Sequence, residues 1–258
     1  TVDFIGGSVT GGTSSVDFNA TSNAAEFADG VTLTGDLNLA GSDAHFEIRN
    51  GLTLNGTANL GGSGATLDFA GTQTLGASSG QTATVDMAPF NAQLRVIDGG
   101  TLTLDSSVTV SGEGYVTGYG AGNAVVNEGL IHADHANGYL RITSESFTNT
   151  GTLRASGDGS LVLQNAWDNN GTIELDAGRL YLYGDRATEN LNQSTLVRGL
   201  GSKVYLAGSL DNTGDVLSQV GTIDFIGGSV TGGTSSVDFN ATSNAAEFAD
   251  GVTLDANL

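Results

Sequence analysis

Apolar residues alternate with polar ones in short runs along most of the chain, and glycine or asparagine separates one run from the next. The clearest runs read glycine, any residue, aliphatic, any residue, aliphatic or Phe: GYLRI at 138–142, GSLVL at 159–163, GRLYL at 178–182, GTIDF at 221–225, and GSKVYL at 201–206 with one inserted residue. A period of two is typical of strands that bury one face. We therefore expect Leu140, Ile142, Leu161, Leu163, Leu180 and Leu182 to point inward.

A second motif, asparagine-x-glycine-x-aliphatic, recurs beside these runs. It begins at Asn127, Asn149, Asn169 and Asn212, and Asn192 fills the remaining gap with Ser194 in the glycine position. The asparagines are 22, 20, 23 and 20 residues apart. Stacked turns would let their side-chain amides hydrogen-bond along the axis as a structural ladder. The glycine two residues later would accept a backbone conformation that larger residues resist. The alternative is that Asn-x-Gly is ordinary turn chemistry.

A period of about 21 residues, with short strands, Gly/Asn turns and no convincing helix, predicts an all-β parallel β-helix, or β-solenoid. Each turn of such a fold pairs with the turns above and below it. Residues 30–110 follow the pattern more loosely, so turns of variable length are expected there. We expect a loop that leaves the column within 77–95, and either one helical turn or a loop at 22–27.

One long segment occurs twice. Residues 3–33 and 224–254 are identical, 221 residues apart, and the match extends to Thr1 and Thr222 with one difference, Val2 against Ile223. Such identity indicates a recent duplication. We interpret residues 1–221 as one tandem unit of a continuous solenoid and 222–258 as the start of the next, so that the chain is a slice of a longer protein. Its first partners would then be adjoining units of the same polypeptide.

The composition narrows the possible functions. With 28 acidic and 8 basic residues the formal net charge is −20, which argues against a nucleic-acid partner, because such binding requires a basic surface. An acidic surface also keeps a large assembly soluble. The absence of cysteine excludes disulfide scaffolds, thiol catalysis and Cys-based zinc sites. No long apolar run is present, so no membrane insertion is expected in this segment.

The runs GVTLTGDLNL, GLTLNGTANL, NEGLIHAD, FTNTGTLRASGDGSLVL, WDNNGTIELDAGRLYL and GSLDNTG resemble the strand-rich repeats of giant bacterial surface and secreted proteins, the filamentous-haemagglutinin-like and giant adhesin class. The resemblance covers most of the chain. It implies a right-handed parallel β-helix, export to the cell surface or the extracellular space, and a role in adhesion, a coat or a fibre. It carries over no catalytic residue.

Few residues suggest chemistry. His132, Asp134 and His135 form the one metal-like cluster, but His135 would turn away from the other two in a strand, and zinc sites usually have three or four converging ligands. A solvated strand end is therefore expected, with no metal and no cofactor.

The sequence contains no complete calcium-binding motif, and GGSGATLDF at 61–69 only partly resembles one. In the aligned strands from residue 138 onward no two carboxylates stand side by side, so we do not expect an enzyme such as the polysaccharide lyases and hydrolases that share the fold.

The same alignment places a strip of tyrosines and cations on one outward face. Its members are Tyr139, Arg141, Arg179, Tyr181, Tyr183, Lys203 and Tyr205. Aromatic faces and cations suit sugar rings and their carboxylates, so the strip could bind a glycan or an acidic polysaccharide. Alternatively, these side chains pack against each other across strands or contact a neighbouring solenoid. The expected function is accordingly a stalk, fibre or coat segment, with an adhesin as the second hypothesis.

Overall fold

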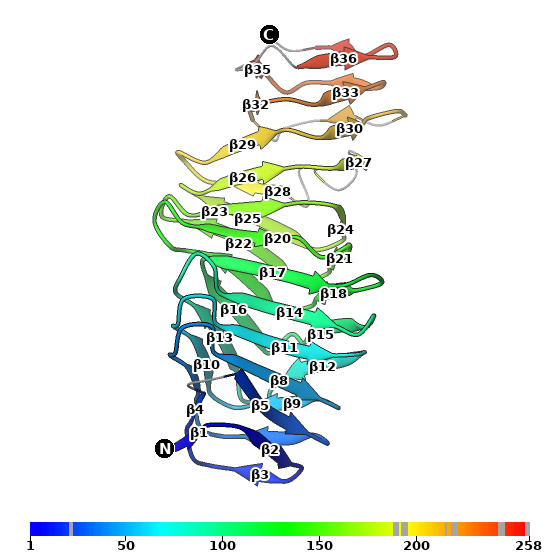
Figure 1. The fold of residues 1–258 in the computed structure, drawn as a ribbon. Helices are drawn as coiled ribbons and strands as arrows, with labels where there is room; N and C mark the ends of the chain where they lie inside the picture. Colours follow the sequence, from blue (N-terminus) through cyan, green and yellow to red (C-terminus); the bar gives the residue numbers. More distant parts are fainter. Residues whose placement is uncertain are drawn as a thin grey trace.

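The computed structural model describes residues 1–20, 23–187, 191, 196–214, 216–217, 221–241 and 246–255. Within these ranges the chain is all-β and contains no α-helix. It winds into a parallel β-solenoid of about 11 turns with a repeat of about 21 residues, and the two termini lie at opposite ends of the column (Figure 1). The fold class predicted from the alternation and the period is therefore confirmed.

Three parallel sheets run along the column, and each turn up to β24 contributes one strand to each of them. Sheet A stacks β1 (Val2–Phe4), β4 (Phe18–Ala20), β7 (Leu37–Leu39), β10 (Thr57–Leu60), β13 (Ala83–Met87), β16 (Val108–Gly112), β19 (Leu130–Ala133), β22 (Thr152–Ser156), β25 (Thr172–Asp176) and β28 (Leu196–Arg198). Sheet B stacks β2 (Gly7–Thr10), β5 (Asn23–Ala28), β8 (His45–Arg49), β11 (Thr66–Ala70), β14 (Gln93–Ile97), β17 (Gly114–Tyr119), β20 (Tyr139–Ile142), β23 (Ser160–Leu163), β26 (Arg179–Leu182), β29 (Lys203–Leu206), β32 (Ile223–Phe225) and β35 (Phe239–Ala241). Sheet C stacks β3 (Thr13–Ser14), β6 (Val31–Leu33), β9 (Leu52–Leu54), β12 (Gln73–Gly76), β15 (Thr101–Leu104), β18 (Ala124–Asn127), β21 (Ser146–Asn149) and β24 (Ala166–Asn169).

Two shorter sheets complete the C-terminal part. Sheet D stacks β27 (Asp185–Ala187), β30 (Ser209–Asp211), β33 (Ser229–Thr231) and β36 (Glu247–Ala249), and β27 lies next to β24, so sheet D extends sheet C. Sheet E stacks β31 (Val216–Leu217), β34 (Thr234–Ser235) and β37 (Thr253–Leu254). In the C-terminal turns the chain passes from sheet B to sheet D, then to sheet E and back to sheet B. In the earlier turns it passes from sheet B to sheet C, then to sheet A and back to sheet B. Sheet E therefore takes the place of sheet A.

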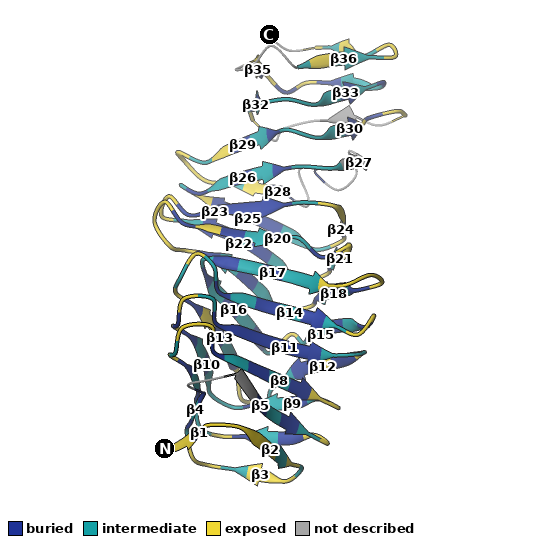
Figure 2. Cartoon of the chain, in the orientation of Figure 1, coloured by how far each residue is buried: buried dark blue, intermediate teal, exposed yellow. Residues whose placement is uncertain are grey.

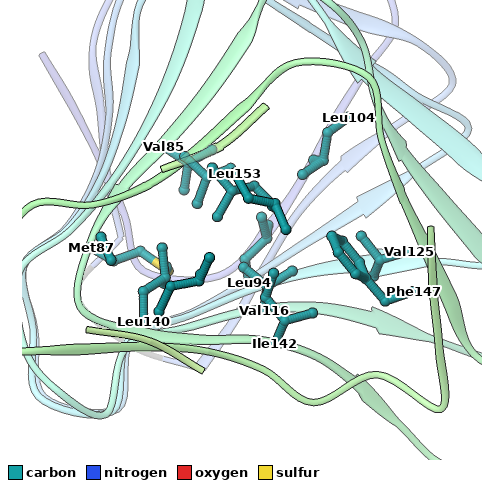
Figure 3. Packing of buried hydrophobic residues seen from close by; sticks show 14 of the residues in the cluster. Val85, Met87, Leu94, Leu104, Val116, Val125, Leu140, Ile142, Phe147 and Leu153 are labelled. Atoms are coloured by element: carbon teal, nitrogen blue, oxygen red, sulfur yellow. The ribbon is translucent and has the colours of Figure 1, made fainter. Parts of the chain in front are cut away.

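The core is a continuous apolar column between the sheets. Alternate residues of each strand point inward, and the predicted inward residues Leu140, Ile142, Leu161, Leu163, Leu180 and Leu182 are all buried. Figure 3 shows how the three sheets meet, with Leu153 of sheet A, Leu94 of sheet B and Phe147 of sheet C converging on the axis. Exposed residues concentrate at the corners between strands and at the column ends (Figure 2). The core is therefore shared by all turns, and no single turn encloses it alone.

Two local expectations need correction. Residues 23–28 form strand β5, neither a helical turn nor a loop, because Ala25 and Phe27 supply inward positions that pair with β8. The segment 77–95 does not leave the column: Ala83–Met87 pairs with both neighbouring turns of sheet A, and Met87 is buried. The extra residues of this segment lie in the corner 77–82, which has six residues where the preceding turn has only 55–56. Phe90 is exposed in the following corner, 88–92, which has the same length as in the preceding turns.

Candidate binding surface on sheet B

The five strands with the Gly-x-aliphatic motif are consecutive neighbours in sheet B, in the register that the motif alignment predicts. Their outward residues form two columns, Tyr139–Ser160–Arg179–Lys203 and Arg141–Val162–Tyr181–Tyr205–Asp224. In a parallel sheet, side chains in one such column stand about 4.8 Å apart. Six of the seven residues of the expected strip are therefore brought together. Tyr183 is the exception: it lies just past the end of β26, and its carbonyl oxygen accepts a hydrogen bond of 3.2 Å from Trp167 Nε1.

Tyr181 contacts the other two tyrosines of the columns. The rings of Tyr181 and Tyr205 are stacked, with centroids 4.6 Å apart and planes 15° apart. The rings of Tyr139 and Tyr181 lie 5.9 Å apart although strand β23 runs between them. This contact is possible because β23 carries short outward side chains, Ser160 and Val162, and both are buried beneath their neighbours. The tyrosines thus form one packed aromatic surface.

Arg141 is integrated into this surface through aromatic rings. Its guanidinium lies 4.6 Å from the ring centroid of Tyr139 and 5.4 Å from that of Tyr115, distances at which cation–π attraction operates. Among the described residues no carboxylate pairs with Arg141. Arg179 differs, because its Nη2 donates to Asp158 Oδ1 at 2.9 Å. Arg141 therefore keeps hydrogen-bond donors for an external anion, whereas Arg179 is already paired.

Burial changes the ionisation of the central tyrosine. Desolvation, reinforced by the neighbouring phenols of Tyr139 and Tyr205, raises the pKa of Tyr181 to about 12. An ordinary tyrosine, with a pKa of about 10, is already neutral at physiological pH. The shift keeps the Tyr181 phenol neutral well above that pH, so its hydroxyl can both donate and accept hydrogen bonds. Stacked aromatic rings beside an unpaired guanidinium are suited to a ligand that has apolar ring faces and negative charge.

A charged cluster that sequence analysis missed lies on the same sheet, nearer the N-terminus. Glu26, Glu47 and Asp68 occupy one outward column on three consecutive turns. Arg95 is next in that column, and its Nε and Nη2 donate to Asp68 at 2.6 and 2.7 Å. His45 Nε2 lies 2.6 Å from the same carboxylate. The glycine–aliphatic motif that aligns the strands begins at residue 138, so no motif brings the acidic positions of the earlier strands into register.

The carboxylates of this cluster are paired with basic side chains. The hydrogen bond with Asp68 raises the pKa of His45 despite partial burial. Burial alone would raise the pKa of Asp68, but the hydrogen bonds from Arg95 and His45 outweigh it and hold that pKa below its usual value. Burial raises the pKa of Glu47, which also forms an ion pair with Arg49. Each carboxylate of the column has a cation beside it, since Arg49 also lies 3.7 Å from Glu26.

Three of the motif asparagines lie in the interior at the ends of sheet C strands, and Asn212 directly follows β30 of sheet D. Asn127 Nδ2 donates to Asn149 Oδ1 at 2.7 Å, and Asn149 Nδ2 donates to Asn169 Oδ1 at 2.7 Å. All three side chains are buried. Asn212 is also buried and donates to the carbonyl oxygens of Gly232 and Thr234. Asn192 lies outside the described residues.

The glycines of this motif are required for a reason different from the expected one. Gly129, Gly151 and Gly171 do not have a positive φ; of the motif glycines only Gly214 does, at 82°. A Cβ on Gly151 would lie 2.2 Å from the carbonyl oxygen of Gly129, and a Cβ on Gly171 would lie 2.2 Å from that of Gly151. At these positions the close stacking of successive turns excludes a side chain.

The histidine cluster is divided between two places. His132 Nδ1 lies 3.8 Å from Asp134 Oδ2 and its Nε2 lies 2.8 Å from Ser156 Oγ, whereas His135 Nδ1 faces Glu113 at 3.6 Å. In the part of the chain that the structure describes, no three His, Cys, Asp or Glu side chains converge into a metal site. The same part contains no helix of the length and hydropathy needed to span a membrane.

Comparison with known proteins adds no assignment. No protein-family model, curated protein or solved structure matches the chain.

Proposed function

We propose that the chain is a structural segment of a large exported surface protein, in which tandem units of one continuous β-solenoid form a stalk, fibre or coat. Its role is mechanical and non-catalytic. Backbone hydrogen bonds between turns run along the axis and provide stiffness, while the acidic surface limits aggregation. The open edges at the column ends would be covered by the adjoining units.

The observation that carries this proposal is the junction between the two copies of the repeated segment. β32 belongs to the second copy, and it pairs directly with β29 of the preceding unit, with Val204 beside Ile223 and Leu206 beside Phe225. All four of these side chains are buried. The apolar core therefore continues across the start of the second copy, as a stiff tandem fibre requires.

Electron microscopy of chains with one, two and four copies of residues 1–221 tests the proposal. Because a turn rises about 4.8 Å, each added unit should lengthen a straight rod by about 50 Å. Particles that bend freely at every junction, like separate beads on a string, would contradict it.

A second candidate function is the binding of an anionic glycan by the tyrosine and cation strip. Arg141, stacked on aromatic rings and unpaired with any described carboxylate, favours it. We expect the protein to be retained on an immobilised anionic polysaccharide and the double variant Tyr181→Ser, Tyr205→Ser to lose that retention. The variant Tyr119→Ser, at an exposed tyrosine outside the strip, is the matched control. Unchanged retention of the double variant would exclude the strip as the binding surface.

A further inference from the structure

The two copies of the repeated segment fold in the same way internally. In the first copy Val2 pairs with Phe18, and in the second Ile223 pairs with Phe239. The pairing of β2 with β5 likewise recurs as β33 with β36, and that of β3 with β6 as β34 with β37. The aromatic contacts match as well: Phe4–Phe18 and Phe225–Phe239 have ring centroids 5.4 and 5.2 Å apart. The local fold of the segment is therefore a property of its sequence.

The sheets that the two copies occupy are nevertheless different. Strands β1, β2 and β3 of the first copy lie in sheets A, B and C, whereas their equivalents β32, β33 and β34 lie in sheets B, D and E. Sheet D extends sheet C, and sheet E takes the place of sheet A. Every strand of the second copy is thus displaced by one sheet position around the axis.

The displacement follows from the number of turns in a unit. Strands β1 and β32 are equivalent and start 221 residues apart. From β1 the chain advances one sheet position to β2, and from β2 it makes ten full turns to reach β32 in the same sheet. A unit of 221 residues therefore corresponds to ten and one third turns. The core tolerates this because inward residues still meet inward residues at the junction. Successive turns also stack as closely at the junction as they do in the first part of the column. At the junction a Cβ on Gly228 would lie 1.9 Å from the carbonyl oxygen of Gly208. In the first part a Cβ on Gly62 would lie 1.9 Å from the carbonyl oxygen of Gly41.

We infer that successive units of the array are rotated by one sheet position, so that equivalent surfaces follow a three-unit spiral around the fibre. The extension to many units depends on the tandem array proposed above. The strip of Tyr181 and Tyr205 lies on sheet B in this unit; in the next unit it lies above sheet C, and in the third above sheet A. A fibre of three units would then present the strip in three directions, so that an anionic glycan, the ligand suggested above, reaches it from every side.

The chain contains no cysteine, which makes disulfide trapping a direct test. With the inferred rotation, Tyr205 and Asp224 are outward register neighbours on sheet B. A unit of an integral number of turns would instead stack β32 on β28 of sheet A and place Asp224 beside Val197, the outward residue of that strand. Neighbouring strands lie about 4.8 Å apart, within the Cα separation of about 4.4–6.8 Å that a disulfide requires.

We expect the variant Tyr205→Cys, Asp224→Cys to lose both free thiols under mild oxidation, and Val197→Cys, Asp224→Cys to retain them. The variant Asp3→Cys, Asn19→Cys is the positive control, because these outward residues are register neighbours in the first copy. Circular dichroism establishes that each variant is folded. Cross-linking of the 197–224 pair, or failure of the 205–224 pair when the control pair cross-links, would overturn the inferred rotation.

A second experiment tests the spiral in the array. Antibody fragments that recognise the strip, bound to a four-unit chain, should project in electron micrographs at successive thirds of a turn. Fragments aligned along one side would contradict the spiral. The disulfide test uses the single chain, so it can succeed even if the native protein contains no array, and the two proposals fail separately.

Discussion

The buried asparagine ladder predicts a specific loss of stability in the variant Asn149→Ala. This change removes the acceptor that Asn127 Nδ2 uses at 2.7 Å and the donor that Asn169 Oδ1 uses at 2.7 Å. Asn127 Nδ2 keeps only the longer contacts with the carbonyl oxygens of Gly129 and Thr152, at 3.2 and 3.3 Å. The substitution also removes the longer hydrogen bonds that Asn149 Nδ2 donates to the carbonyl oxygens of Gly151 and Thr172, both at 3.3 Å. The loss of the two short hydrogen bonds, with their remaining partners buried, corresponds to about 2–4 kcal/mol of unfolding free energy.

A matched control is available on the outer surface. Asn38 also belongs to a ladder, since its Nδ2 donates to Asn19 at 3.2 Å and its Oδ1 accepts from Asn59 at 2.7 Å, but its side chain is only partly buried. Water replaces those hydrogen bonds in Asn38→Ala, so the expected loss is below about 1 kcal/mol. This outer ladder was not anticipated from the sequence.

Urea unfolding followed by far-ultraviolet circular dichroism compares the two variants. The single tryptophan, Trp167, is buried two residues before Asn169, so its fluorescence reports unfolding of the ladder region specifically. The ladder argument predicts a lower midpoint for Asn149→Ala by both probes. Equal losses in Asn149→Ala and Asn38→Ala would refute the claim that burial makes the ladder important.

Two further predictions concern packing and pH. Gly151→Ala should lower the unfolding free energy by about 2 kcal/mol or more, because the new Cβ meets the backbone of the preceding turn. Gly61→Ala is the control and should be close to neutral, since nothing lies within 4 Å of a Cβ at that position. Equal urea midpoints for the two variants would contradict this prediction. The pKa of His45 is raised in the folded protein. The pairing of His45 with Asp68 therefore stabilises the fold fully at a pH below about 6.5, the ordinary pKa of histidine, and this stabilisation is lost as the pH rises through the pKa of His45 in the folded state. The stability difference between wild type and His45→Gln should therefore be larger near about pH 5.5 than near about pH 9, and a difference independent of pH would disprove the contribution of this pair. The lowered pKa of Asp68 has the opposite sign, so its contribution is present above its ordinary pKa and lost as the pH falls through the folded value.

The fold could be predicted from sequence because two periodicities agree. Alternation within each strand indicates which side chains point inward, and the 21-residue spacing of the motifs fixes which strands are neighbours. Together they give the register of sheet B, including the column of Arg141, Tyr181 and Tyr205. The motif glycines were found in the same way, but the physical reason for most of them, the close approach of stacked backbones, depends on three-dimensional packing.

The remaining features could not be predicted because the spacing in the first part of the chain is irregular. The column of Glu26, Glu47 and Asp68 includes a register shift between β5 and β8, at Asn23 and Ala25, which no motif marks. The rotation between units depends on summing the lengths of ten unequal turns, and an error of a few residues in any corner changes the result. Sequence periodicity thus defines local register more securely than the winding of the whole unit.

The central claim, that this chain is one part of a tandem solenoid array, is tested most directly by the mass of the native polypeptide. A large-pore denaturing gel, probed with an antibody against residues 224–254, makes this measurement, because that sequence occurs in both copies. The account predicts a species far larger than the 26.0 kDa of this chain, with length variants that differ by whole units. A single species of about 26.0 kDa would contradict it.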